Sequence, residues 1–180
     1  MKMIQRLRQF ARENKGIAAL EFAIIAPLLM VPLMLGSVDL IDVMNVNKRA
    51  QNATSSLADV VARDTEISNV ELSSLWRALD VLMYPDASSA MEIRISSISI
   101  VNASTAQVVW SEGHGGMGAR QAGTNVALDS RMMTVGTSII MVESAYKYDA
   151  PLGFLIQDQV RMTHNAYRRS RLVDPIPRVS

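Results

Sequence analysis

The most apolar part of this chain contains one carboxylate. Glu21 is the only charged residue between Ile17 and Val38. A carboxylate in hydrocarbon is tolerated when a positive group pairs with it. Gly16 lies just before this run, and a residue without a side chain does not obstruct a protease groove. Cleavage after Gly16 would give Ile17 a charged α-amino group, with a reference pKa of about 7.7–8.0, that can neutralise Glu21. We therefore expect these residues to form one processing signal.

The other candidates for chemistry lack the context that their chemistry needs. Residues 113–118 fit the dinucleotide-binding pattern GxGxxG, but a polar, glycine-interrupted stretch follows where that site needs a helix. We expect a flexible loop between strands there. The spacing of His114 and His164 brings no metal ligands together, so each is expected to be a surface or structural histidine. No GxSxG elbow is present, and we expect no cofactor, no metal and no enzymatic activity.

The charges of the first segment point to a membrane. Before Gly16 the chain carries five basic residues and one acid, whereas the whole chain has a net charge of +1. No basic face stands out elsewhere, so nucleic acid is not an expected partner. The chain has no cysteine, so its fold cannot depend on disulfides. The basic residues of this leader are Lys2, Arg6, Arg8, Arg12 and Lys15.

Residues 17–38 are long enough to cross a bilayer. A span needs about 20 apolar residues, each with a rise of about 1.5 Å, to cross about 30 Å of hydrocarbon. Pro27 and Pro32 each remove a helical hydrogen bond, which predicts a bent or locally melted helix. The basic leader precedes the run, and Asp39 and Asp42 follow it. The positive-inside rule then keeps the N-terminus in the cytoplasm and exports the rest of the chain.

Two other interpretations of this segment remain open. An ordinary signal peptide would be removed near Gly36 and Ser37, although an acid early in its apolar region opposes insertion. A plain uncleaved anchor would let Glu21 extend to the headgroups. In either case the exported part would be a membrane-tethered or secreted binding or scaffold module, and a tethered enzyme is the remaining alternative.

The residues around the expected cleavage point resemble a known processing signal. The segment Lys15-Gly16-Ile17-Ala18-Ala19-Leu20-Glu21-Phe22 resembles a type IV prepilin processing site. Together with the basic leader and the apolar run, it resembles the TadE-like minor pseudopilins of the tight-adherence (Tad, Flp) pilus, within the type IV pilin-like superfamily. Residues 144–156 and 164–172 resemble the tyrosine-rich strand and the arginine-ended strand of that family.

The resemblance implies a role in pilus assembly. It implies that a membrane-embedded prepilin peptidase cuts after Gly16 on the cytoplasmic side, and that Glu21, followed by Phe22, aligns an incoming subunit by pairing with an N-terminus. The implied partners are this peptidase, other pilin or pseudopilin subunits, the inner-membrane assembly platform and the lipid bilayer. The implied location is the bacterial inner membrane, crossed once, with a periplasmic C-terminal domain and with incorporation into the pilus.

Two helices are expected after the apolar run begins. An apolar stripe at spacings of three and four extends the first helix to Asp64-Thr65, and its members are Val46, Ala50, Ala53, Leu57 and Val60. Ser68 and Glu71 form a capping box that begins a second helix, and Tyr84-Pro85 ends it. The apolar stripe of the second helix, which includes Trp76, is expected to face the core.

From Met91 the period of the apolar residues changes toward two, which predicts strands. The expected strands are residues 91–101 and 107–112, joined as a hairpin, then 133–150 and 159–169. In the first strand Ile95 and Ile98 fall on opposite faces, which predicts a bulge near Ser96-Ser97. The arginine-rich run at residues 168–171 is expected to be a solvated strand end.

These elements predict an α+β protein with a pilin-like shape. It should have a long N-terminal transmembrane and amphipathic helix, a second short helix and a small antiparallel β-sheet. The expected parts are a cytoplasmic leader (1–16), a transmembrane helix (17–38), an exported extension of that helix (39–67), a periplasmic α+β domain (68–173) and an irregular tail (174–180).

Overall fold

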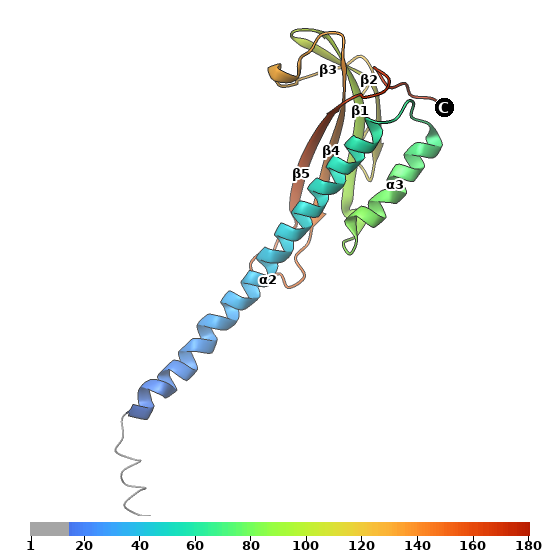
Figure 1. The fold of residues 1–180 in the computed structure, drawn as a ribbon. Helices are drawn as coiled ribbons and strands as arrows, with labels where there is room; N and C mark the ends of the chain where they lie inside the picture. The colour runs from blue at the N-terminus through green and yellow to red at the C-terminus, as the bar shows by residue number, and fades with distance from the viewer. Residues whose placement is uncertain (1–14) are drawn as a thin grey trace, which may run out of the picture.

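The computed structural model describes residues 15–180 as a long helix that carries a small domain at one end (Figure 1). The long helix is α2 (Lys15–Val61), and a second helix, α3 (Asn69–Met83), packs against the same antiparallel sheet. The expected α+β class is therefore confirmed. Of the expected leader, Lys2, Arg6, Arg8 and Arg12 lie outside the described residues, and their role stays a prediction.

Helix α2 is exposed over its first half and packed over its second. The second half lies on strands β4 and β5 through the expected apolar stripe, in which Ala50 and Leu57 are fully buried. Val60 is a correction, because it is 53% exposed and Val61 is buried instead. A step of four from Leu57, rather than three, keeps a residue on the buried face at this point.

The two prolines of α2 do not interrupt it. The helix runs continuously through Pro27 and Pro32, so the expectation of local melting is wrong. Each proline removes one hydrogen bond, but the bonds on either side of it still hold the turn. Helix α2 ends at Val61, and turn hydrogen bonds continue to Asp64, close to the predicted end.

Helix α3 begins at the predicted capping box. The Ser68 side chain accepts a hydrogen bond from the Glu71 backbone N–H (3.2 Å), and the Glu71 carboxylate accepts one from the Ser68 N–H (2.6 Å). These hydrogen bonds lower the pKa of Glu71. The core-facing stripe is also confirmed, and the helix ends before Tyr84 as expected. The buried residues of α3 are Leu72, Leu75, Leu79 and Met83.

The sheet has five strands in the order β3-β2-β1-β4-β5, and every neighbouring pair is antiparallel. The strands are β1 (Met91–Asn102), β2 (Thr105–His114), β3 (Asn125–Val126), β4 (Ser138–Tyr148) and β5 (Val160–Arg169), with short 3-10 turns η1 (Ser88–Ala90) and η2 (Ser130–Met132). The four long strands are the predicted ones. Strand β3 was not predicted, because two residues in a polar stretch cannot show an alternating pattern.

Both faces of the sheet are covered. Ile95 of β1 faces the helices, whereas Ile98 lies in a second apolar cluster with Val126 and residues that follow β3. The predicted bulge is present, but its extra residue is Val109 of β2, between the pairs Ser97–Trp110 and Ile98–Val108. Strand β1 pairs with β4 without a register shift, so β1 itself is not bulged. Its apolar residues lie on both faces because both faces of the sheet are buried.

The irregular tail packs against the domain. Ile176 is fully buried, and its carbonyl accepts a hydrogen bond from Trp110 Nε1 (2.8 Å). Backbone hydrogen bonds join Ile67, just before α3, to residues on either side of Arg178. The tail thus closes the end of the core at which α2 and α3 meet.

Candidate assembly site

Gly16 lies in the first turn of α2 with open space around it. It is exposed, its backbone is outside the left-handed region, and a Cβ built on it meets no atom within 4 Å. Nothing in the described fold therefore requires glycine at this position. A requirement for glycine would come from a molecule that binds this segment from outside.

Glu21 is free to pair with a cation outside the domain. Ile17 and Glu21 lie four residues apart on one face of α2, and Phe22 follows with 70% of its surface exposed. Among the residues whose side chains the structure describes, none forms an ion pair with Glu21. The structure thus places the predicted assembly residues together at the uncovered end of α2, far from the domain (Figure 1).

An apolar surface occupies α2 between these residues and the domain. Its exposed members from Leu20 to Met34 are Leu20, Phe22, Ile24, Ile25, Leu28, Leu29, Met30, Val31, Leu33 and Met34. An exposed apolar surface of this extent marks contact with a membrane or with other proteins. Within residues 15–180, α2 is the one helix long and apolar enough to cross a membrane, by length and composition. Such a helix is consistent with a membrane anchor.

A second group of polar contacts lies where α2 enters the domain. Asp39 is fully buried, and its Oδ2 accepts hydrogen bonds from the backbone N–H groups of Phe154 (2.7 Å) and Leu155 (3.0 Å). Its other oxygen, Oδ1, has no hydrogen-bond partner among the described residues. The Leu155 side chain covers Gly36, where an added Cβ would lie 2.6 Å from Leu155 Cδ1. The loop between β4 and β5 is thereby fastened to α2.

The next turns of α2 add further contacts to the domain. Asp42 accepts a hydrogen bond from the Tyr148 hydroxyl (2.8 Å), and Arg49 forms an ion pair with Asp86. Burial and this hydrogen bond to Asp42 raise the pKa of Tyr148, so it remains a donor at neutral pH. Deeper in the domain, the buried hydroxyls of Thr54 and Ser144 share a hydrogen bond (2.6 Å). Polar contacts therefore fix α2 on the sheet along its packed half.

Comparison with known proteins gives one match. Residues 16–59 match the family model described as TadE-like protein, from Gly16 to the packed half of α2. Over these residues the chain is similar to TadE-like proteins of the Tad pilus system. This family suggests a pilin-like protein associated with the Tad pilus, and it is generally structural rather than catalytic. Neither the curated proteins nor the solved structures gave a match to the chain.

The arginine-rich end of β5 is solvated as expected, since Arg169 and Arg171 are exposed, but it also forms contacts with other parts of the domain. Arg171 donates a hydrogen bond to Asp59 of α2 (2.6 Å), and Arg168 Nε lies 3.7 Å from the same carboxylate. Arg169 donates to the Thr134 hydroxyl (2.7 Å). A strand end beside an acidic residue of the packed helix pairs with it, a contact that the strand's own sequence does not reveal.

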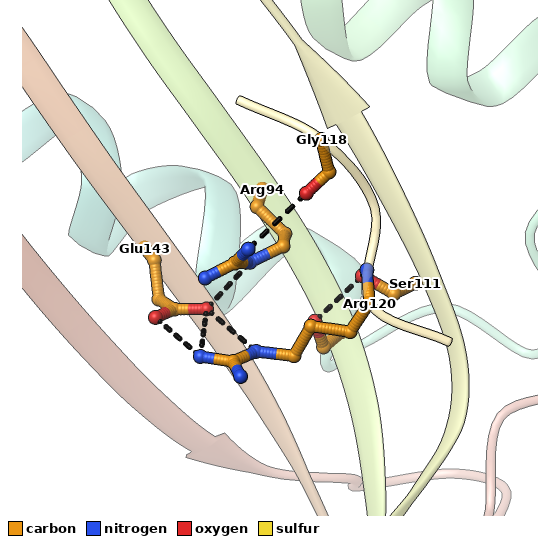
Figure 2. Close-up of polar contacts among 6 residues, drawn as sticks. Arg94, Ser111, Gly118, Arg120 and Glu143 are labelled. Carbon is orange, nitrogen blue, oxygen red and sulfur yellow. Dashed lines mark hydrogen bonds and ion pairs between the residues drawn. The ribbon is translucent and has the colours of Figure 1, made fainter. Parts of the chain in front are cut away.

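Figure 2 shows an ion-pair network on the face of the sheet away from the helices. Glu143 of β4 accepts hydrogen bonds from Arg94 of β1 (2.7 Å) and from Arg120 (2.8 Å at its closest). Arg94 also donates to the Gly118 carbonyl (3.1 Å), and the Arg120 backbone N–H donates to Ser111 Oγ (3.0 Å). Burial raises the pKa of Glu143, but the hydrogen bonds and charges of the two arginines outweigh it and hold that pKa below its ordinary value.

The network shows what the glycine-rich run at residues 113–118 does in this fold. Gly115 and Gly116 have positive φ (69° and 107°) and turn the chain at the end of β2. The Arg94 and Arg120 contacts then hold the following residues against the sheet. Residues 115–118 lie in a loop between strands as predicted, whereas Gly113 and His114 still belong to β2. No α-helix follows the run, as a dinucleotide site would need.

The two histidines have structural surroundings. The His114 ring stacks on Trp76 of α3, with 4.8 Å between the ring centroids. His164 is half-buried, its Nε2 has no partner among the described residues, and burial lowers its pKa. Over residues 15–180, no group of three or more histidine or acidic side chains is placed to hold a metal ion.

Sequence reasoning missed the role of Asp39 and Gly36, although a signal for both was present. The buried stripe of α2 extends backward from Val46 at spacings of seven and ten residues to Asp39 and Gly36. A carboxylate at a core-facing position needs hydrogen-bond donors, and a glycine there leaves room for a neighbouring side chain. Both positions lie where the uncharged run ends, so the charge pattern alone indicates only the end of a span there.

Proposed function

We propose that this protein is a TadE-like, non-catalytic minor pseudopilin that prepilin peptidase processes after Gly16 and that assembly of a tight-adherence pilus requires. One observation carries the proposal most directly. An exposed apolar helix has an unobstructed Gly16 and an unpaired Glu21 at one end and a small α+β domain at the other. This arrangement suits a subunit that is anchored in a membrane and then packed by its helix into a fibre used in adhesion or secretion.

The proposed orientation follows the charges. The basic leader stays in the cytoplasm, residues 17–38 cross the inner membrane once, and the domain lies in the periplasm. Glu21 then lies near the cytoplasmic side of the membrane. This is the side on which prepilin peptidase would find Gly16, and the assembly platform would meet the mature helix there before the subunit enters the pilus.

Processing and assembly are coupled through Glu21. The α-amino group that cleavage gives to Ile17 is positive at neutral pH. Glu21 lies exposed on the same face of the helix, and a carboxylate in hydrocarbon is stabilised by a charged partner. The ammonium of a neighbouring subunit supplies this partner as the incoming helix comes into register, so an uncut subunit would lack the group that aligns it.

The structure also bears on the alternative of an ordinary signal peptide removed near Gly36 and Ser37. Gly36 is buried under Leu155, and Asp39 accepts two hydrogen bonds from the loop that covers it. Cleavage there would cut a continuous helix at the turn where it is fastened to the domain. These contacts support a protein that keeps its apolar helix.

Mass spectrometry of the protein purified from native membranes tests the cleavage. We expect the mature chain to begin at Ile17, and Gly16→Leu to leave the chain uncut. The matched control is Ala19→Leu, which adds the same bulk at another exposed position of the first turns and should still be cut. A native chain that begins at Met1 or near Ser37 would overturn the proposal in favour of a tethered or secreted scaffold.

A second experiment tests the pairing. Glu21→Ala and the isosteric Glu21→Gln should both abolish piliation while mass spectrometry still finds cleavage after Gly16. If both variants assemble pili at the native level, the proposed pairing of Glu21 with an ammonium is wrong, although the processing step would stand.

A further inference from the structure

The loop between β4 and β5 exposes an uncharged apolar tip. Residues 150–156 carry no charge, and within them Leu152 and Leu155 are 51% and 62% exposed. Phe154 is 42% exposed, whereas Ile156 packs against the core. Large side chains exposed together on a short loop are unfavourable in water, which indicates that another apolar phase covers them.

The position of this tip along α2 is fixed by contacts. The backbone N–H groups of Phe154 and Leu155 donate to Asp39, and the Leu155 side chain lies on Gly36. In Figure 1 the loop lies at the end of the sheet where the bare part of α2 leaves the domain. The loop thus cannot move away from the helix without breaking both of these hydrogen bonds.

This position coincides with the outer end of the proposed span. Gly36 precedes Val38, the last residue of the uncharged run, by two residues, or about 3 Å of helix. With Ile17–Val38 across about 30 Å of hydrocarbon, the tip of the loop lies at the boundary between acyl chains and headgroups.

The loop also removes a charge from this boundary. Asp39 would face the acyl chains or headgroups if the loop were absent, and a carboxylate there is costly. With the loop in place Asp39 is fully buried, while Leu40, Ile41 and Met44 on other faces of the helix remain exposed. The loop and these side chains together surround α2 with an apolar belt that continues the surface of the span.

We propose that the tip of the β4–β5 loop, through Leu152, Phe154 and Leu155, inserts into the outer leaflet of the membrane as a second contact beside α2. The loop holds the domain at a fixed height and rotation on the bilayer before the subunit enters a fibre. This inference rests on the proposed membrane insertion of residues 17–38 but does not depend on cleavage after Gly16. Lipid is favoured over a second copy of the chain because the apolar surface of the tip continues that of the span.

Fluorescence quenching in vesicles tests this contact. The chain has no cysteine, so single-cysteine variants of the full-length protein can each carry one environment-sensitive dye. Leu152→Cys reports on the loop, and Phe154→Cys is a second reporter should the first disturb the fold. Leu29→Cys reports on the anchor, and Val135→Cys, exposed at the far end of the sheet, is the matched control. The vesicles contain phosphatidylethanolamine and phosphatidylglycerol with spin-labelled lipids.

We expect shallow spin labels to quench the loop reporters, deep labels to quench Leu29→Cys, and neither to quench Val135→Cys. If Leu29→Cys is quenched and both loop reporters behave like Val135→Cys, the proposed contact of the loop with lipid is wrong, whereas the proposed membrane anchor is supported. If no position is quenched, the membrane anchor itself is wrong. Loop reporters that are shielded from aqueous iodide but not quenched by lipid would indicate a second copy or another protein, which also overturns the proposal.

Discussion

Substituting Asp39 with alanine should release the β4–β5 loop without disturbing α2. The substitution removes two hydrogen bonds to a charged acceptor, at 2.7 and 3.0 Å, each worth about 1.5–3 kcal/mol. It also relieves the burial of a carboxylate whose Oδ1 has no partner, which offsets part of that loss. We therefore expect loop opening to become easier by at least about 1.5 kcal/mol, or about tenfold in the opening equilibrium.

The helix should respond in the opposite direction. Alanine has a higher helix propensity than aspartate by up to about 0.7 kcal/mol, so α2 itself should be as stable as before or slightly more stable. A melting temperature would mix these two effects. Hydrogen exchange separates them, because the N–H groups of Phe154 and Leu155 report on the loop, whereas those around Val46 report on the helix.

The assay is hydrogen exchange with mass spectrometry on the full chain in detergent. Asp39→Ala should accelerate exchange of the loop peptide that contains Phe154 and Leu155 by about tenfold or more. Asp42→Ala is the matched control, since it removes a carboxylate one turn away that binds Tyr148 and not the loop amides. Equal exchange in the native chain and Asp39→Ala, or a larger effect in the control, would refute the fastening of the loop by Asp39.

Three further predictions concern the domain, and each can be measured by urea or thermal unfolding. Glu143→Gln should destabilise the protein at pH 7 by roughly 1–3 kcal/mol, because it weakens charged hydrogen bonds to two arginines. The contribution of ionised Glu143 to the free energy of unfolding is fully present above its unfolded pKa, about 4.3, and is lost as pH falls through its lower folded pKa. The difference in stability between the native protein and Glu143→Gln should therefore shrink with acidification, and a pH-independent difference would contradict this. Ser68→Ala should cost about 1 kcal/mol through loss of the α3 cap, whereas no change would mean that the capping box does not stabilise the domain. Ala53→Leu should cost about 1–3 kcal/mol by overpacking the seam between α2 and the sheet, and exposed Val60→Leu, the control, should be close to neutral.

Much of the fold could be predicted because its signals are local. The capping box at Ser68, the period of the α2 stripe and the alternation of the strands each depend on neighbours a few residues apart. The location of the bulge was also predictable. The strand that carries the extra residue was not predictable. Apolar residues fall on both faces of β1 because two different parts of the chain bury these faces, and the sequence of β1 alone does not distinguish this from a bulge.

The candidate site was predictable to different degrees at its two ends. Gly16 and Glu21 stand out because a glycine and a lone acid border an apolar run. The role of Asp39 depends on a loop that lies 115 positions further along the chain. The contacts of Arg168 and Arg171 with Asp59 likewise join distant segments, so the local charge pattern indicated the exposure of these arginines but not their partner.

The two ends of the bare helix are linked by geometry. Glu21 and Asp39 are 18 residues apart, which is five turns of an α-helix, or about 27 Å. Because α2 is one continuous helix, Glu21 lies on the same face of it as Asp39 and the β4–β5 loop. A subunit that pairs with Glu21 would therefore approach on the side that carries the domain, and the rotation of α2 would set the rotation of the domain in a fibre.

Insertions into the exposed part of α2 test whether Glu21 must lie on the same face of the helix as Asp39. Two alanines inserted after Leu33 would rotate Glu21 by about 200° relative to Asp39 and lengthen the helix by about 3 Å. Four inserted alanines would rotate Glu21 by about 400°, close to one full turn, and lengthen the helix by about 6 Å. If the face of Glu21 matters, piliation should be lost with two alanines and largely kept with four, while both chains are still cut after Gly16. Piliation that falls steadily with the added length would mean that reach along the membrane normal matters rather than rotation, and the coupling of Glu21 to the orientation of the domain would then be wrong.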